Sequence, residues 1–261
     1  CGIAECNMVG VAAGLATCGK IPFAASFAMF SAGRAFEQVR NSVGYPKLNV
    51  KIVGSHAGIS VGEDGATHQC CEDIALMRTI PGMVILNPCD HYEMQAAVRA
   101  AVEHKGPCYI RLGRLAVESI NNNDDYKFEL GKGITLREGT DITVVATGLM
   151  VQEAVKAADA LKEEGISVEV INIHTIKPLD EELVIASAKK TGRVITVEEH
   201  NIIGGLGEAV STALSEHCPT PVTRTGVNDV YGHSGPAVDL LKEFGLSAEH
   251  IAEVIREKLA K

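Results

Sequence analysis

Two histidines and two acidic residues lie in one glycine-rich stretch, His56-Ala-Gly-Ile-Ser-Val-Gly-Glu63-Asp64-Gly-Ala-Thr-His68. So many ionisable side chains in a short loop are hard to explain as packing, because charged residues are rarely buried without partners. Imidazole and carboxyl groups suit hydrogen bonding and proton transfer near neutral pH. A metal site is the weaker interpretation, because the spacing of the histidines matches no standard ligand pattern.

A second group of candidates precedes this loop. Glu5 follows Gly2-Ile3-Ala4 and opens a run of small residues, where the spacing alone favours a first-turn acid stabilised by the helix dipole. Phe23, Phe27 and Phe30 are half of the six phenylalanines of the chain. Their spacing alone favours a core cluster.

Two arginines follow an apolar strand-like segment in Arg111-Leu-Gly-Arg114. A guanidinium group makes forked, charge-assisted hydrogen bonds to anions, so one or both could hold an anionic substrate group; a solvent-facing role is equally compatible for either alone. Glu198-Glu-His200-Asn-Ile-Ile-Gly-Gly-Leu-Gly207 is a weak dinucleotide signal, because it lacks the G-x-G-x-x-G pattern. The other histidines are interpreted as surface or satisfied loop groups: His91, His104, His174, His217, His233 and His250.

The apolar pattern predicts the scaffold for these side chains. Strand-like and helix-like segments alternate along the chain, which is typical of parallel sheets covered by helices, and such sheets bind ligands at the carboxyl ends of their strands. We predict an α/β fold of two domains, 1–125 and 126–261, each a mainly parallel sheet with helices on both faces. The polar stretch Asn121–Asp125 is the expected linker. The predicted strands are 21–26, 50–54, 83–86, 109–112, 142–146, 168–173, 194–197 and 222–225. The predicted helices are 6–18, 32–41, 72–79, 91–103, 151–163, 181–190, 207–216 and 248–259.

Composition narrows the class of protein. The 261 residues have 24 basic and 33 acidic side chains and a net charge of −9, which argues against a nucleic-acid-binding surface. The longest nearly uncharged run, 6–21, is too short to span a bilayer. None of the eight cysteines forms a C-x-x-C pair, so we expect buried free thiols in a reducing cytoplasm. The chain starts with Cys1 rather than Met, and we expect its natural start to lie upstream.

These segments, in this order, resemble the C-terminal half of transketolase over essentially the whole chain. Gly2-Ile-Ala-Glu5 is similar to the glutamate motif of that family, Phe27-Ala-Met-Phe30 to its paired aromatics, and Gly62-Glu-Asp-Gly-Ala-Thr-His-Gln69 to its most diagnostic loop. Ile173-His-Thr-Ile-Lys-Pro-Leu-Asp180 and Val197–Gly207 resemble its C-terminal domain. The length fits the C-terminal subunit of a split transketolase, with a pyrimidine-binding domain and a C-terminal domain.

The resemblance implies thiamine diphosphate as cofactor. Glu5 would hydrogen-bond the pyrimidine N1′, a contact that requires a protonated carboxyl, and burial raises the pKa of an acid. Phe27 and Phe30 would flank the pyrimidine ring; the family often has Tyr at the second position. The Gly-Asp-Gly…Asn motif, which holds Mg²⁺ or another divalent cation and the diphosphate, is absent from this sequence. The resemblance therefore implies an N-terminal partner subunit and an assembly of two copies of each half, paired through the pyrimidine domains.

The resemblance also implies the substrate contacts. His68 would face the reacting carbons and help proton transfer, and Asp64 would recognise an acceptor hydroxyl. His56 and Arg114 would bind the sugar phosphate, whereas Arg111 has no clear counterpart. The reaction is transfer of a two-carbon ketol unit from a ketose phosphate to an aldose phosphate, with the cofactor supplying the electron sink.

Four alternatives stay open. Deoxyxylulose-phosphate synthase also has a Gly-x-Asp-Gly-x-Thr-His loop, but His56 argues against it. The beta subunit of a 2-oxo acid dehydrogenase lacks the Asp-Gly-x-Thr-His arrangement. A sugar-phosphate variant acting on an unusual branched ketose is compatible with the sequence. A non-catalytic scaffold subunit of the same fold is the alternative outside the enzymes, against which the joint presence of Glu5, Asp64, His68 and both aromatics argues.

Overall fold

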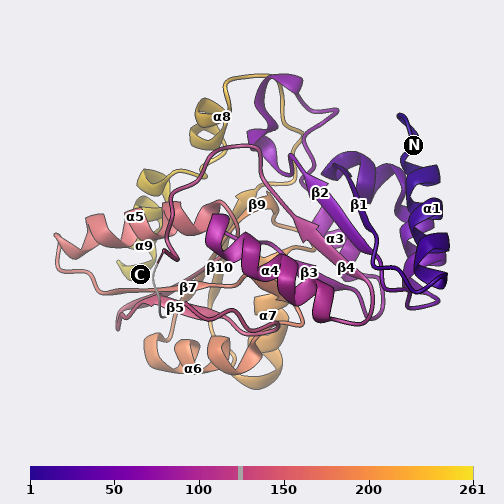
Figure 1. The fold of residues 1–261 in the computed structure, drawn as a ribbon. Helices are drawn as coiled ribbons and strands as arrows, with labels where there is room; N and C mark the ends of the chain where they lie inside the picture. Colours follow the sequence, from indigo (N-terminus) through magenta and orange to yellow (C-terminus); the bar gives the residue numbers. More distant parts are fainter. Residues whose placement is uncertain (123–125, 261) are drawn as a thin grey trace.

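The computed structural model describes residues 1–122 and 126–260, which form two five-stranded sheets side by side (Figure 1). Each sheet is mainly parallel and is covered by helices, so the predicted fold class is confirmed. The expected linker lies partly outside the described residues, at 123–125. Within the described parts of the chain, no helix is both long and apolar enough to cross a bilayer.

The first sheet has the order β1-β2-β4-β3-β8. Four parallel strands, β1 (Phe23–Phe27), β2 (Lys51–Ser55), β4 (Cys108–Arg111) and β3 (Val84–Leu86), match predicted strands within a few residues. The fifth strand, β8 (Thr175–Lys177), comes from the second half of the chain and pairs antiparallel with β3. The β3–β8 pair therefore joins the two domains that were predicted on either side of residue 125.

Both faces of the first sheet are covered. Alternate strand residues such as Ile52 and Tyr109 pack into one core with the helices on their side, whereas Leu86 and Ile110 pack with Ala97 on the other. This alternation follows from the two-residue period of a strand. One face is covered by α1 (Glu5–Thr17), η1 (Met29–Arg34), η2 (Val39–Gly44) and α3 (Asp73–Arg78), and the other by α4 (His91–Glu103).

The predicted helix at 32–41 differs from the structure. This segment consists of the π-helical turns η1 and η2 on either side of the short helix α2 (Phe36–Gln38). π-Helical turns insert an extra residue per turn and occur often at functional sites. The 3.6-residue apolar pattern correctly indicated a helical segment, but it contains no signal for the wider winding.

The second sheet has the order β10-β9-β6-β7-β5. The central strands β6 (Ile142–Ala146) and β7 (Val168–Asn172) are wholly buried, as expected for parallel strands covered on both faces. β9 (Val194–Asn201) and β10 (Val222–Val227) run further than predicted. β5 (Ile134–Arg137) was not predicted, because it is a partly exposed antiparallel edge strand without a buried apolar run.

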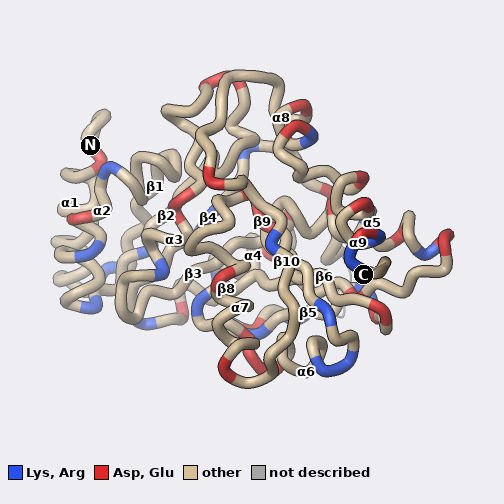
Figure 2. The backbone as a smooth tube through the Cα atoms, turned by 180° about the vertical axis from the view of Figure 1, so that it is seen from behind, with Lys and Arg blue, Asp and Glu red and all other residues tan. Residues whose placement is uncertain are grey.

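Helices on the second sheet begin and end at clear local signals. α6 (Glu181–Thr191) starts with Asp180, whose carboxyl accepts a hydrogen bond from Leu183 N at 3.2 Å, and ends at Gly192 in the left-handed conformation. Acidic residues lie at its start and lysines at its end, visible as red and blue in Figure 2. The remaining helices are α5 (Met150–Lys162), α7 (Leu206–His217), α8 (Ala237–Glu243) and α9 (Ala248–Leu259), of which α8 was not predicted.

All eight cysteines are free. The expectation of buried thiols is right for Cys70, Cys89 and Cys108 and wrong for Cys1, Cys6 and Cys18, which are exposed.

Candidate active site

The carboxyl ends of β1 and β2 bring two predicted site residues into contact. Phe27 is the last residue of β1, and His56 comes directly after the last residue of β2. Because these parallel strands are neighbours, the two rings stack with their centroids 3.9 Å apart and their planes at 11°. The backbone of His56 has φ of 56°, a left-handed turn that directs the chain into the loop after β2.

Phe30 and His68 extend this contact into one aromatic surface. The Phe30 ring lies 6.3 Å from that of Phe27 and nearly parallel to it. His68 meets both rings edge-on, at 5.2 Å from Phe30 and 6.3 Å from Phe27. Phe23 lies at the other end of β1 and is 42% exposed. The interpretation of the three phenylalanines as a core cluster is therefore wrong: two of them form a half-buried surface with the histidines.

Glu5 is the first residue of α1 and is almost completely buried. Its carboxyl accepts hydrogen bonds from Ser26 Oγ at 3.3 Å and from Arg34 Nη1 at 3.0 Å. The guanidinium of Arg34 also lies 4.5 Å above the Phe30 ring. Glu5, Arg34, Phe30 and His68 are therefore linked by a continuous series of contacts.

The expectation of a raised pKa at Glu5 is wrong for this structure. A hydrogen bond from its own backbone amide lowers the pKa most, and the hydrogen bond and positive charge of Arg34 lower it further; burial opposes them. Sequence reasoning missed Arg34, although its position four residues after Phe30 in a helical segment is a usable signal.

The two candidate histidines are each oriented by a neighbouring hydroxyl group. Ser55 Oγ lies 3.0 Å from His56 Nδ1, and Thr67 Oγ1 lies 2.9 Å from His68 Nδ1. Burial and, second to it, the positive charge of Arg114 lower the pKa of His56, and Asp64 partly opposes this effect. His56 is therefore favoured as a neutral imidazole, which can donate through one ring nitrogen and accept through the other.

Arg114 and Asp64 lie at the exposed side of this loop. Arg114 Nη1 donates to Glu63 Oε2 at 3.0 Å and to the carbonyl oxygen of Val61. This contact lowers the pKa of Glu63, after a larger effect of its own backbone amide. Asp64 is exposed. Glu63 was part of the loop motif but was given no role, and the structure makes it the ion-pair partner of Arg114.

Arg111, in contrast, is buried between the two halves of the chain. It donates to both carboxyl oxygens of Asp73, at 3.1 and 2.9 Å, and to the carbonyl oxygen of Glu199 at 2.8 Å. Tyr109 donates to the same aspartate at 2.7 Å. Arg111, for which the sequence left an anion-binding and a solvent-facing role open, therefore has a structural role, because its donors bind protein groups.

The glycine-rich segment at 197–207 also has a structural role. The Glu198 carboxyl accepts from the amides of Leu206 and Gly207, at 2.6 and 2.7 Å, which are the first amides of α7. Burial raises the pKa of Glu198 to about 7. His200 Nε2 accepts from Ala75 N at 3.3 Å. The amides that a nucleotide phosphate would need are thus bound by Glu198, and the weak dinucleotide signal is wrong.

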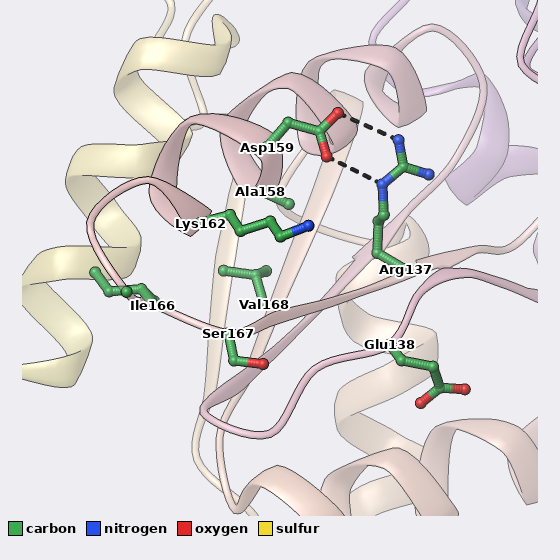
Figure 3. A pocket seen from close by; sticks show the side chains of 9 residues that line it. Arg137, Glu138, Ala158, Asp159, Lys162, Ile166, Ser167 and Val168 are labelled. Carbon is green, nitrogen blue, oxygen red and sulfur yellow. Dashed lines mark hydrogen bonds and ion pairs between the residues drawn. The ribbon is translucent and has the colours of Figure 1, made fainter.

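A cavity of about 280 Å³ lies away from these residues, between β5 and α5. Figure 3 shows the Arg137 guanidinium and the Asp159 carboxylate facing each other at its edge, joined at 3.0 and 3.2 Å. Its lining contains none of the predicted site residues. Arg137 and Asp159 neutralise each other at this cavity, and we assign it no role in the candidate active site.

Two known protein-family domains match most of the chain. The transketolase pyrimidine binding domain matches residues 1–119, and the transketolase C-terminal domain matches residues 131–251. The chain belongs to the transketolase family. The predicted resemblance is confirmed.

Individual relatives cover nearly the whole chain. The chain is 53% identical to a putative transketolase C-terminal section of Methanocaldococcus jannaschii, over all of this chain and 82% of the relative. It is 49% identical to a 6-deoxy-6-sulfo-D-fructose transketolase subunit of Clostridium sp. strain MSTE9, over 98% of this chain and 79% of the relative. A solved structure, described as a split gene transketolase and an inactive beta4 tetramer, superimposes with a TM-score of 0.93 at 50% identity. The superposition covers 99% of this chain and 83% of the solved chain.

Proposed function

We propose that this chain forms the pyrimidine-side half of an active site that transfers a two-carbon ketol unit from a ketose phosphate to an aldose phosphate. The observation that supports this most is the single surface formed by Phe27, Phe30, His56 and His68, with the Glu5–Arg34 pair against Phe30. Flat rings, proton-transfer groups and a buried carboxyl are the groups that this chemistry needs in one place.

The residues of this surface fit the pyrimidine ring of thiamine diphosphate. Phe27 and Phe30 are only half-buried and would flank the ring, while Glu5 would hydrogen-bond its N1′. When bound, the cofactor supplies the electron sink for cleavage of the ketose carbon–carbon bond. In this structure the hydrogen bond from its own backbone amide and, after it, the contact with Arg34 lower the pKa of Glu5. A protonated Glu5 at N1′ therefore requires that these contacts be weakened.

The loop residues take the substrate roles in this proposal. Arg114, half-exposed and cationic, binds the sugar phosphate together with His56. His68 hydrogen-bonds the donor hydroxyls and relays protons at the reacting carbons, and Asp64 recognises an acceptor hydroxyl. For Arg114 to bind phosphate, the substrate must displace or share the contact with Glu63, which is a weak pair at an exposed position.

The proposal includes an N-terminal partner subunit that binds the diphosphate and Mg²⁺ or another divalent cation. The exposed face of α1 supports association through this domain. Val11 and Leu15 are each nearly half exposed there. A Cβ atom added to Gly10 or Gly14 would have no atom of another described group within 4 Å, so this face of the helix is open. Apolar helix faces of this kind occur at protein–protein interfaces. We propose two copies of each half, and a cytoplasmic location that suits the eight free cysteines.

Substrate choice within this reaction has one supported alternative. The Clostridium relative is named for a sulfofructose. A sulfonate and a phosphate are both tetrahedral oxyanions that a guanidinium group binds. We therefore propose pentose and related sugar phosphates as first substrates and sulfonated ketoses as the second candidate.

The test is ketol transfer from xylulose 5-phosphate to ribose 5-phosphate, with magnesium and thiamine diphosphate. The assay is run on this chain, on its diphosphate-binding partner and on the mixture, and is repeated with 6-deoxy-6-sulfo-fructose as donor. The proposal predicts transfer only in the mixture. A formed complex that binds the cofactor but transfers no ketol unit from either donor contradicts the reaction, and a complex that binds no cofactor favours the scaffold alternative.

A further inference from the structure

The loop after β2 is held in place by groups from the second half of the chain. Gly58, Gly62 and Gly65 all have positive φ, and the intervening η3 (Ile59–Asp64) is a 3₁₀ segment interrupted at Gly62. Such a glycine-rich segment has high conformational entropy when free. A fixed conformation therefore requires contacts from outside the loop.

Glu199 supplies one of these contacts from the second half of the chain, beside the contact of Arg114 with the Val61 carbonyl oxygen from the first. It lies in β9, only 3% exposed, and its Oε1 accepts a hydrogen bond from Ser60 N at 2.6 Å. Ser60 lies in the first turn of η3, where amides have no partner within the helix. The second domain thus caps a turn of the first domain with a buried carboxylate.

The loop backbone passes directly over this carboxyl group. A Cβ atom at Gly58 would lie 2.4 Å from the Glu199 carboxyl carbon. Glycine is therefore needed at position 58 for space as well as for its φ of +84°. Position 58 is two residues after His56, so the place of the Glu199 carboxyl limits where the His56 end of the loop can lie.

Glu199 is itself fixed from the first domain. Arg111 donates to its backbone oxygen at 2.8 Å and to the Asp73 carboxylate, and all three residues are buried. A second contact across the same boundary joins Gln69 Nε2 to the carbonyl oxygens of Ile59 and His233, at 3.1 and 2.9 Å. The loop is thus held at its first turn by Glu199 and near its end by Gln69.

We propose that Glu199 is a positioning residue through which the C-terminal domain sets the place of His56, Asp64 and His68. It does not contact substrate; its carboxyl group fixes the turn η3, which follows His56, contains Asp64 and precedes His68. The expected loss of turnover rests on the proposed function, whereas the fixed position of the loop after β2 concerns this chain alone. Misplacement of reacting groups by about 1 Å reduces turnover by about 100-fold, which sets the expected size of the effect.

The test compares Glu199→Ala and Glu199→Gln with Glu198→Gln as matched control. Glu198 is the neighbouring buried carboxyl, but it binds the start of α7 and not the loop. Amide hydrogen exchange at 58–64 and the separate kcat and KM values are measured on the complex with the partner subunit. For Glu199→Ala we expect faster exchange at 58–64 and a loss in kcat of about 100-fold. Glu199→Gln keeps an acceptor for Ser60 N and should restore most of both.

The control separates positioning from general destabilisation. Glu198→Gln should lower the melting temperature but leave loop exchange, kcat and KM close to wild type. Unchanged exchange at 58–64 in Glu199→Ala overturns the proposal, as does an equal loss of kcat in Glu199→Ala and Glu198→Gln. If the wild-type complex shows no ketol transfer, the proposed function fails. The exchange data alone then decide whether Glu199 fixes the loop.

Discussion

The carboxyl edges of the two sheets both carry ionisable side chains, but these side chains have different roles. At the first sheet, Phe27 and His56 form a half-buried surface, and the nearby Arg114 is partly exposed. At the second sheet, Glu198 and Glu199 at the end of β9 are buried and bind backbone amides of α7 and of the loop in the first domain. In a doubly wound sheet this edge ordinarily binds a ligand. Here the edge of the second sheet binds the first domain, so the polar groups of one edge position those of the other.

The largest expected effect is at Glu5. Glu5→Ala removes the carboxyl that faces the proposed pyrimidine position, and we expect a loss in kcat of about a thousandfold, within the range for a positioned acid–base group. Turnover of the complex with the partner is the measurement, and Glu216→Ala, an exposed acid on α7, is the control. A rate within a few-fold of wild type contradicts the role of Glu5.

The two arginines at 111 and 114 give the sharpest contrast between buried and exposed roles. Arg111→Met leaves the buried Asp73 carboxylate without its ion pair, and we expect a loss of about 3–5 kcal/mol in the free energy of unfolding. Arg114→Met should lower stability by no more than about 1.5 kcal/mol, since its pair with Glu63 is exposed and it otherwise loses one hydrogen bond to the Val61 carbonyl oxygen. It should instead raise KM for the phosphorylated donor by at least about tenfold, through loss of one charge-assisted contact.

Denaturant unfolding and steady-state kinetics on the same two variants test this contrast. A destabilised Arg114→Met with unchanged KM reverses the assignment of the two arginines.

A pH effect of intermediate size is expected at His174. This residue was interpreted as a surface or satisfied loop histidine, but it is fully buried and stacks on Phe128, and burial lowers its pKa to about 4. An unfolded histidine takes up a proton near pH 6.5, so the folded state loses relative stability as the pH falls from about 6.5 to 4, by about 3 kcal/mol in all.

The difference in unfolding free energy between wild type and His174→Gln, followed from pH 7.5 to pH 4, measures this effect. His217→Gln, at a half-exposed position, is the control. The same pH slope in wild type and His174→Gln contradicts the account.

The smallest expected effect is at Phe30. Phe30→Tyr keeps the ring that contacts Phe27, His68 and Arg34 and adds one hydroxyl, so kcat should change less than about tenfold. Phe30→Ala removes the ring and should weaken thiamine diphosphate binding more than Phe30→Tyr does. Equal affinity of Phe30→Ala and Phe30→Tyr for thiamine diphosphate would show that Phe30 does not contact the cofactor.

Much of the scaffold could be predicted from sequence, because it depends on local pattern. Buried strands such as β6 and β7 are rich in β-branched residues, and helices such as α6 have a cap and a charge bias at each end. The strands β5 and β8 could not be predicted in the same way, because each is an antiparallel edge strand that is defined by its pairing rather than by an apolar run of its own.

The candidate site was predictable to a similar degree. The 56–68 loop was identified by residue type, whereas Glu5, Phe27 and Phe30 were identified only through the family resemblance, because their spacing alone favoured structural roles. Arg34 and Glu199 were missed, because their roles depend on contacts across 29 and 139 positions of sequence. The pKa of Glu5 is lowered first by its own backbone amide and then by Arg34, so burial alone gave the wrong direction.

Thiamine diphosphate binding by calorimetry tests the central claim most directly. Cofactor is titrated, with magnesium, into this chain, into the partner subunit, and into mixtures containing wild type or Phe27→Ala. The account predicts tight binding in the wild-type mixture, much weaker binding to either subunit alone, and reduced affinity with Phe27→Ala. Equally tight binding by the partner subunit alone, unaffected by this chain or by Phe27→Ala, would contradict a cofactor site shared with the aromatic surface of the first domain.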